Sequence, residues 1–149
     1  MQLSDYLDQA FVLAELKSRT KSEVLAELIA PIGAKRPDVD PALARKVLLE
    51  REGLGTTGIG DGIAIPHGKL PGLGSVIVAV GRSREGVDFE ALDFKPCTIF
   101  FLVLAPEQVA GLHLRILAQI SRLLRDEAFR RLFLAAEDAP ALWKLLQGV

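Results

Sequence analysis

The stretch GTTGIGDGIAIPHG, residues 55–68, contains five glycines and one proline in fourteen positions. Glycine permits backbone conformations and close approaches that other residues cannot adopt, and proline fixes its own φ angle. This composition predicts a loop of defined shape and not a flexible spacer. Helices are predicted before this loop, and strands followed by helices are predicted after it.

Two helices are predicted upstream of the loop. Thr20 and Glu23 have capping-box spacing, and the apolar residues that follow predict an amphipathic helix ending near Gly33. Asp40 and Pro41 are typical of an N-cap and a first helical position, so a second helix should run over residues 41–53. Its last turn would carry Arg51.

The remaining segments predict an α/β protein. Residues 11–16 form a candidate short strand, and the β-rich runs 75–81 and 98–105 should lie inside a sheet. Apolar residues keep helical spacing from Val109 onward, and two shorter helices should cover residues 127–136 and 139–147. Helices flank strands on both sides in the sequence, and 149 residues is a usual length for one domain, so we expect a single domain over residues 1–149.

Charge and hydropathy argue against two classes of function. The 18 basic and 19 acidic residues are interspersed, without the basic stripe that nucleic-acid binding requires. The longest nearly apolar stretch, residues 97–105, is half of the roughly 20 residues that a membrane-spanning helix needs. No basic patch followed by an apolar run marks a secretory signal. We therefore expect a cytoplasmic protein that neither binds nucleic acid nor inserts into a membrane.

The cysteine and histidine content argues against a metal centre. Cys97 is the only cysteine, which excludes an internal disulfide and a thiolate metal cage, and it is interpreted as a small buried hydrophobe. The two histidines, His67 and His113, have no clustered carboxylate or cysteine beside them, as a zinc site would need. We expect no metal and no cofactor.

His67 is the strongest candidate for a chemical role. Pro66 fixes the backbone on one side of it, and Gly68 allows neighbouring main chain to approach on the other. A neutral imidazole is a good nucleophile near neutral pH, because its unperturbed pKa is roughly 6.5 and one ring nitrogen keeps a lone pair. The sequence does not show which nitrogen that is.

The glycines of the loop are candidates for an anion cradle. Phosphoryl transfer needs in-line positioning, positive charge and N–H donors, and glycine-rich turns supply such donors. The order of residues matches neither a P-loop nor a dinucleotide fingerprint, so nucleotide binding is not supported. A turn-rich crossover without chemistry is the alternative.

Each remaining candidate also has a structural interpretation. His113 falls in the first turn of the long helix, where it is either a site residue or a core histidine bonded to a carbonyl. Arg51 would otherwise be a solvated charge near a helix C-terminus, Thr56 and Thr57 would be turn formers, and Asp61 would serve a turn.

Two blocks of sequence carry a family resemblance. LLEREGLGTTGIGDGIAIPHGK, residues 48–69, closely resembles the active-site signature of enzyme IIA proteins of the sugar phosphotransferase system, in the fructose/mannitol/nitrogen-regulatory class. LAPE at 104–107, followed by HLRILA at 113–118, looks like the second signature of that family. Residues 70–73 and 87–93 look most like the nitrogen-type branch. The resemblance implies a mixed sheet between helices.

The resemblance also implies roles for individual residues. His67 matches the phosphorylated histidine, His113 the second active-site histidine, and Arg51 the arginine that faces the phosphoryl group. The loop positions expected to bind the phosphoryl group are Thr56, Thr57, Gly58 and Gly60. For partner docking we expect apolar residues beside the loop, namely Ile59, Ile63, Leu70 and Leu73; the alternative is that two of these four belong to the core. Asp61 stands where many relatives have asparagine, which adds a negative charge near the acceptor.

Several functions fit these expectations. In the first, His67 attacks the phosphohistidine of an HPr-type carrier, and the protein then regulates targets according to its phosphorylation state. In the second, it is the IIA component of a sugar permease and passes the phosphoryl group to a cysteine on a IIB partner. The third is a non-catalytic interaction module. A hydrolase using His67 as a base is a distant fourth, because no serine or cysteine nucleophile with an accompanying acid is identifiable. The oligomeric state is open.

Overall fold

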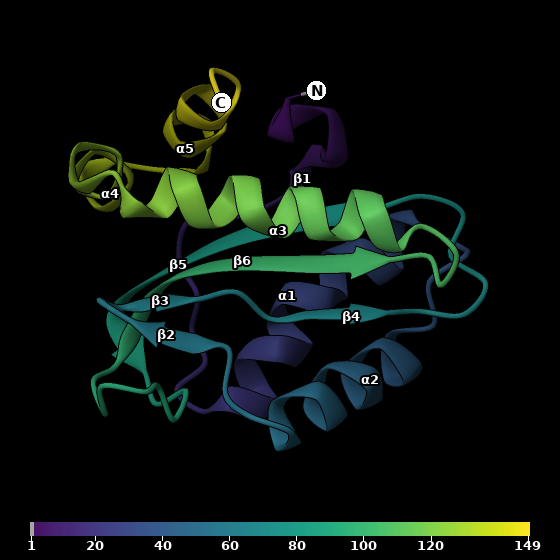
Figure 1. The fold of residues 1–149 in the computed structure, drawn as a ribbon. Coiled ribbons are helices and arrows are strands. Elements are labelled where there is room, and N and C mark those ends of the chain that lie inside the picture. The colour runs from purple at the N-terminus through teal and green to yellow at the C-terminus, as the bar shows by residue number, and fades with distance from the viewer. Residues whose placement is uncertain (1) are drawn as a thin grey trace.

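The computed structural model describes residues 2–149 and consists of a sheet between two layers of helices (Figure 1). A 3-10 turn (η1, Leu3–Tyr6) precedes the first strand. The strands are β1 (Leu7–Leu13), β2 (Gly58–Gly60), β3 (Ile63–Ala64), β4 (His67–Lys69), β5 (Ile77–Val87) and β6 (Cys97–Ala105). The helices are α1 (Lys21–Lys35), α2 (Pro41–Gly53), α3 (Ala110–Arg125), α4 (Glu127–Ala135) and α5 (Ala139–Leu146).

The sheet is mixed, as the resemblance implied. Its main path runs in the order β1-β5-β6-β3-β2, and β4 also pairs with β6. β5 and β6 are antiparallel, whereas β6 runs parallel to both β3 and β4. Two short strands therefore pair in succession with the same side of β6. β3 pairs with Ile99 and Phe100, and β4 pairs with the residues from Val103 to Ala105. This arrangement places the end of the glycine-rich loop against the centre of the sheet.

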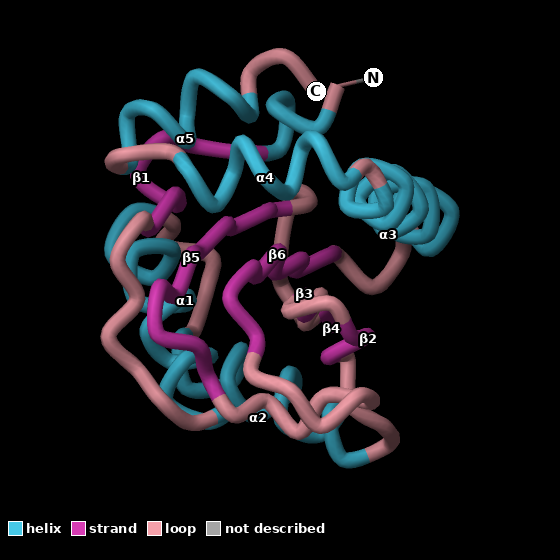
Figure 2. The backbone as a smooth tube through the Cα atoms, turned by 90° about the vertical axis from the view of Figure 1, so that its left-hand side faces the viewer, coloured by secondary structure: helices cyan, strands magenta, loops and turns pink. Residues whose placement is uncertain are grey.

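Helices cover both faces of the sheet. In Figure 2, α1 and α2 lie on one side of the strands and α3, α4 and α5 lie on the other. Side chains alternate along β6: Phe100, Leu102 and Leu104 pack with the first layer, whereas Ile99, Phe101 and Val103 pack with the second. The α/β class predicted from the sequence is confirmed, and Cys97 is a buried, unpaired cysteine.

The predicted helix starts are confirmed by their caps. The Thr20 hydroxyl accepts a hydrogen bond from the Glu23 amide, and the Asp40 carboxylate accepts from the amides of Ala42 and Leu43. The first helix continues to Lys35, two residues beyond the predicted end, because Gly33 keeps helical geometry there. Arg51 lies on the last turn of α2, as predicted.

The strand boundaries needed three corrections. β1 begins at Leu7 and ends at Leu13, earlier than predicted, because its exposed first half has no apolar alternation. β5 extends through polar residues to Val87; Arg82 is buried there and donates to the carbonyls of Ala14 and Phe133 at 3.2 and 3.0 Å. The segment expected to be one loop contains the short strands β2, β3 and β4.

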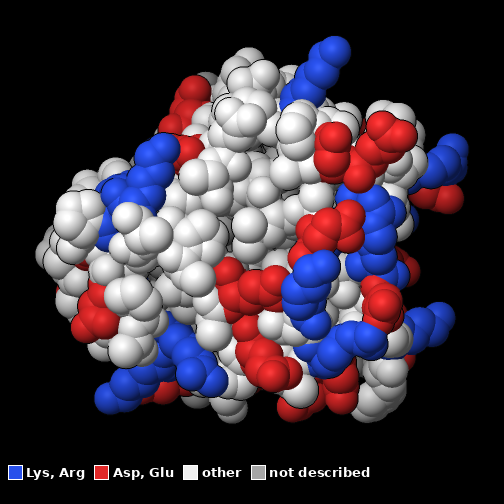
Figure 3. All heavy atoms as spheres, turned by 180° about the vertical axis from the view of Figure 1, so that it is seen from behind, with Lys and Arg blue, Asp and Glu red and all other residues white. Residues whose placement is uncertain are grey.

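Charges on the rear face are mixed in sign. Figure 3 shows Lys and Arg atoms lying beside Asp and Glu atoms on that face. Ion pairs of this kind include Arg84 with Glu15 at 3.0 Å and Lys35 with Asp8 at 2.6 Å. No helix among residues 2–149 is both long enough and apolar enough to cross a lipid bilayer.

Candidate functional site

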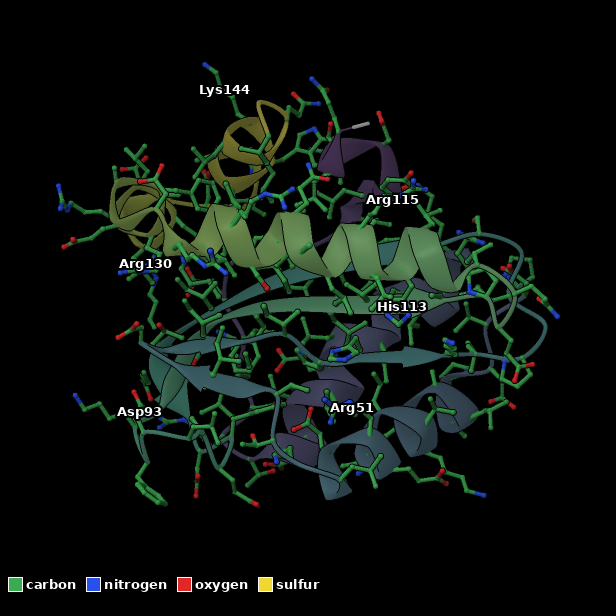
Figure 4. All side chains as sticks on the ribbon, in the orientation of Figure 1. Arg51, Asp93, His113, Arg115, Arg130 and Lys144 are labelled. Atoms are coloured by element: carbon green, nitrogen blue, oxygen red, sulfur yellow. The ribbon has the colours of Figure 1, made fainter. Side chains whose placement is uncertain are left out.

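The fold brings Arg51, His67 and His113 to one hollow of about 450 Å³. Arg51 comes from the end of α2, His67 begins β4, and His113 lies in the first turn of α3. Figure 4 shows His113 reaching from α3 toward β4, with Arg51 beyond that strand near the end of α2. The other lining residues are Val47, Glu50, Leu54, Gly68 and Lys69. Three segments far apart in the sequence thus meet at one place.

The backbone around His67 is held from two sides. On the sheet side, the Val103 amide donates to the Pro66 carbonyl at 2.9 Å, and His67 pairs in register with Val103. On the helix side, a Cβ added to Gly68 would lie 2.8 Å from Cγ1 of Val47. Glycine at this position therefore lets β4 lie directly against α2, which fixes the place of His67.

The ring of His67 has one nitrogen bonded and one nitrogen free to react. Its Nδ1 lies 2.7 Å from the Ile65 carbonyl oxygen, which only accepts hydrogen bonds, so Nδ1 carries the proton. The lone pair then resides on Nε2. Burial lowers the pKa of His67 below its usual value, and the nearby Arg51 charge lowers it further, against the opposing effects of the Ile65 bond and Glu52. The ring is therefore a neutral nucleophile near pH 7.

His113 and Arg51 supply donors beside this ring. The His113 ring is buried and meets the His67 ring edge to face, with the centroids 5.8 Å apart. Its Nε2 is buried and has no hydrogen-bond partner among the described residues, and burial lowers the pKa of His113. Nη1 of Arg51 donates to the Gly55 carbonyl at 2.9 Å.

Lys69 is a further cation at the hollow that the sequence analysis did not identify. It is exposed and stands two residues after His67 on β4. Alternate residues of a strand share a face, so this spacing was the available signal. The hollow is thus lined by two cationic side chains, Arg51 and Lys69, and by two imidazoles.

The four loop residues expected to bind the phosphoryl group lie apart from the lining of this hollow. The Thr56 hydroxyl donates to the Phe89 carbonyl and accepts from the Gly58 amide, both at 3.1 Å. Thr57 is buried, and both its amide and its hydroxyl donate to the Glu52 carboxylate. Gly60 lines a different hollow, together with Arg125 and Arg130. In this structure the two hydroxyls brace the loop.

The expected docking residues need a correction. Ile63, Leu70 and Leu73 are buried in the core at 3%, 1% and 6% exposure, so their side chains are not part of the surface. Ile59 is 49% exposed and remains available. Two exposed apolar residues near the histidines were missed: Leu54, which lines the hollow, and Leu114, which follows His113. The available signal was their place in the sequence: Leu54 lies three residues after Arg51, and Leu114 directly follows His113.

The described residues hold no metal-binding cluster. Within residues 2–149, no group of three or more His, Cys, Asp and Glu side chains is arranged to hold an ion.

Comparison with known proteins gives the family. Residues 5–149 match the family described as phosphoenolpyruvate-dependent sugar phosphotransferase system, EIIA 2. The chain is 40% identical over 146 residues to a nitrogen regulatory protein of Bradyrhizobium diazoefficiens, covering 98% of this chain and 95% of that protein. It is 42% identical over 127 residues to a fructose-specific EIIA component of Haloferax volcanii, covering 85% and 80%.

A solved structure agrees with this assignment. The nitrogen regulatory protein IIA-Ntr from Neisseria meningitidis superposes with a TM-score of 0.88 at 28% identity, over 97% of this chain and 98% of that one. The fold, the family match and the relatives all lead to the same group. The chain belongs to the type 2 EIIA family of the phosphoenolpyruvate-dependent sugar phosphotransferase system.

Proposed function

We propose that this protein is a phosphocarrier that accepts a phosphoryl group on Nε2 of His67 from an HPr-type phosphohistidine protein. It then either passes the phosphoryl group to a protein partner or binds a partner according to its phosphorylation state. The observation that carries the proposal is the 2.7 Å hydrogen bond from Nδ1 of His67 to the Ile65 carbonyl. That bond selects the tautomer in which Nε2 has the lone pair. The depressed pKa of His67 keeps that lone pair free of a proton.

The transfer needs no proton removal from His67. The Nε2 lone pair attacks phosphorus, the P–N bond of the donor breaks, and its electron pair returns to the imidazole of the donor. The His67 ring then carries the phosphoryl group on Nε2 and keeps its proton on Nδ1. The Ile65 carbonyl stabilises the positive charge that this ring acquires, because it accepts a hydrogen bond from the charged form.

The hollow supplies charge compensation for the phosphoryl oxygens. Phosphoryl transfer relies on positive charge and N–H donors around the equatorial oxygens, with little other chemistry from the protein. Arg51, Lys69 and His113 line the hollow, and Nε2 of His113 is buried without a hydrogen-bond partner among the described residues. We assign His113 as a donor to a phosphoryl oxygen through Nε2–H, and Arg51 as a cation beside it.

Phosphorylation would also change which proteins bind. A phosphoryl group adds about −1.5 to −2 charges at neutral pH. Here it would lie in the same hollow as the exposed apolar Leu54, and the exposed Leu114 directly follows His113, which lines that hollow. A partner that packs on these leucines would meet a doubly charged group in one state and a neutral ring in the other. This contrast is compatible with a regulatory role, and the 40% identity to a nitrogen regulatory protein supports a role of that type.

A sugar-permease role is the second candidate. The 42% identical relative from Haloferax volcanii is named a fructose-specific EIIA component. In that role the phosphoryl group on His67 would pass to a cysteine of a IIB partner. Mixing the phosphorylated protein with a fructose-type IIB domain distinguishes the two roles: transfer to the IIB cysteine favours the permease component, and retention on His67 favours the regulator.

The primary test is phosphorylation in a purified system. The protein is incubated with phosphoenolpyruvate, enzyme I and an HPr-type carrier, and added phosphate is mapped by intact mass. Wild type should gain one phosphate, and the His67→Ala variant should gain none. A parallel incubation with phosphoramidate, a small P–N phosphoryl donor, examines the histidine without a partner. No phosphorylation by either route would support the interaction module instead.

A further inference from the structure

Glu52 is a buried carboxylate next to Arg51 that has no role in the transfer described above. It is 7% exposed, on the last turn of α2. Neighbouring helical positions point about 100° apart around the axis, so Arg51 faces the hollow while Glu52 faces the interior. A charge buried at this depth needs partners to offset the loss of water.

Both carboxylate oxygens of Glu52 are used by such partners. Oε1 accepts from the Thr57 amide at 2.9 Å and lies 3.2 Å from Nζ of Lys21. Oε2 accepts from the Thr57 hydroxyl. Lys21 is itself largely buried, and its Nζ lies 4.9 Å from the centroid of the Phe89 ring. The carboxylate therefore ties the end of α2 to the glycine-rich loop and to the start of α1.

From Thr57 an unbroken chain of hydrogen bonds leads to the reacting ring. The Thr57 carbonyl accepts from the Ile65 amide at 3.1 Å. The Ile65 carbonyl in turn accepts from Nδ1 of His67 at 2.7 Å. Glu52, Thr57, Ile65 and His67 thus form one series in which each member fixes the next. The last bond is the one that selects the tautomer of the nucleophile.

The same carboxylate also bears on Arg51. Arg51 donates to the Gly55 carbonyl, two residues before Thr57. Because Glu52 bonds Thr57, it fixes one end of the segment 55–57, and the other end of that segment carries the Gly55 carbonyl. Arg51 and Glu52, which are adjacent on α2, therefore both hold the glycine-rich loop. Arg51 bonds the loop at the hollow, and Glu52 bonds it in the core.

We propose that Glu52 is a positioning residue of the phosphoryl-accepting site, which orients His67 through Thr57 and Ile65 and orients Arg51 through the same loop. This proposal rests on the proposed function of His67. Glu52 is buried and does not line the hollow, so it acts through other residues and not on the phosphoryl group.

The test compares Glu52→Gln, which keeps the shape but removes the charge, with Glu52→Asp, which keeps the charge. The Gln amide cannot accept from both Thr57 groups and Lys21 in the native way. We expect the maximal rate of single-turnover phosphorylation by phosphoramidate and by a phosphorylated HPr-type carrier to fall by roughly 10- to 100-fold, as a small misplacement of a reacting group produces. The half-saturating carrier concentration should stay within about twofold of wild type. Glu52→Asp should recover part of the rate.

A second readout examines the ring directly in the unphosphorylated protein. Long-range ¹H–¹⁵N spectra report which nitrogen of His67 carries the proton, and a titration reports its pKa. In Glu52→Gln we expect a smaller fraction of the Nδ1–H tautomer and a lower pKa for His67, because the Glu52 carboxylate raises that pKa in wild type. Thr57→Val, which deletes only the hydroxyl contact and keeps the Glu52 charge, should give a smaller loss of the Nδ1–H tautomer, and it serves if Glu52→Gln does not fold.

A control separates positioning from general stability. Ala44 is buried on the same helix two turns before Glu52, and Ala44→Gly weakens α2 without touching the loop. It should leave the tautomer and the maximal rate unchanged. A folded Glu52→Gln variant with the wild-type tautomer and rate would overturn the proposal. Absence of phosphorylation in wild type would overturn the proposed function, while the spectra would still decide whether Glu52 orients the His67 ring.

Discussion

The rings of His67 and His113 meet edge to face with their centroids 5.8 Å apart, although 46 positions separate them in the sequence. At this separation a phosphoryl group on one ring lies within reach of an N–H of the other. We expect His113→Ala to lower the rate of His67 phosphorylation by phosphoramidate by roughly 10- to 100-fold, the value of a hydrogen bond to a charged group of about 1.5–3 kcal/mol. Leu114→Ala is the control, because that exposed side chain adjoins His113 without a polar group. Equal rates for His113→Ala and wild type would remove His113 from the mechanism.

The charge of Arg51 has a measurable effect on His67. Since Arg51 lowers the pKa of His67, Arg51→Gln should raise that pKa and slow phosphorylation. An NMR titration of the His67 ring measures its pKa, and single-turnover labelling measures the phosphorylation rate. Lys46→Gln removes a charge of the same sign from an exposed position on α2 and should change neither. A drop in the His67 pKa on Arg51→Gln would contradict the assigned geometry.

The contact between Gly68 and Val47 should govern stability. In Gly68→Ala the new Cβ meets Cγ1 of Val47 at 2.8 Å, and we expect a loss of about 1–3 kcal/mol from overpacking. Val47→Ala removes the opposing methyl groups, so the double variant should cost less than the sum of the two single variants. Denaturant unfolding measures all three. In Gly53→Ala nothing lies within 4 Å of the added Cβ, so the free energy of unfolding should not fall and should rise by up to about 1 kcal/mol.

The two buried histidines predict a loss of stability in mild acid. The pKa of each is lowered in the folded protein, so the unfolded chain binds more protons just below the ordinary histidine value of about 6.5. Stability should therefore fall as the pH decreases from about 7 toward 5. Carboxylates whose pKa is lowered in the folded protein, such as Asp38 with a pKa of about 2, lose their contribution to stability only at lower pH. Urea midpoints at pH 7.5, 6.5 and 5.5 measure this slope, and the double variant His67→Gln, His113→Gln should flatten it.

The exposed leucines beside the hollow should matter only for protein partners. Leu54 and Leu114 are 86% and 67% exposed. We expect Leu54→Ser or Leu114→Ser to raise the half-saturating concentration of the HPr-type carrier by about tenfold, as loss of an apolar contact at an interface centre does. Labelling by phosphoramidate should not change. Leu132→Ser, at a 59% exposed position on α4, is the matched control. An unchanged carrier dependence in both variants would place the docking surface elsewhere.

The sequence predicted the elements that local chemistry specifies. Thr20 and Asp40 marked the helix starts because capping needs only neighbouring residues. Which of the four docking candidates are core residues was not predictable, because Ile63 lies in a two-residue strand and Leu70 and Leu73 lie outside any strand, so no periodicity marks their buried side. The link from Glu52 to His67 was also out of reach, because it runs through main-chain groups that only the folded sheet brings together. One signal did exist: Ala44, Leu48 and Glu52 recur every four residues, which places Glu52 on the buried face of α2.

The position of β4 has a consequence for association between molecules. β4 pairs with β6 and with no other strand among residues 2–149, so His67 lies at an edge of the sheet. An open edge is a template on which a foreign strand can add, a hazard for a protein that repeatedly exposes this site to other chains. α2 packs on β4 at this point, where a Cβ added to Gly68 would lie 2.8 Å from Cγ1 of Val47. A strand that adds to this edge would therefore lie beside α2 as well as beside β4.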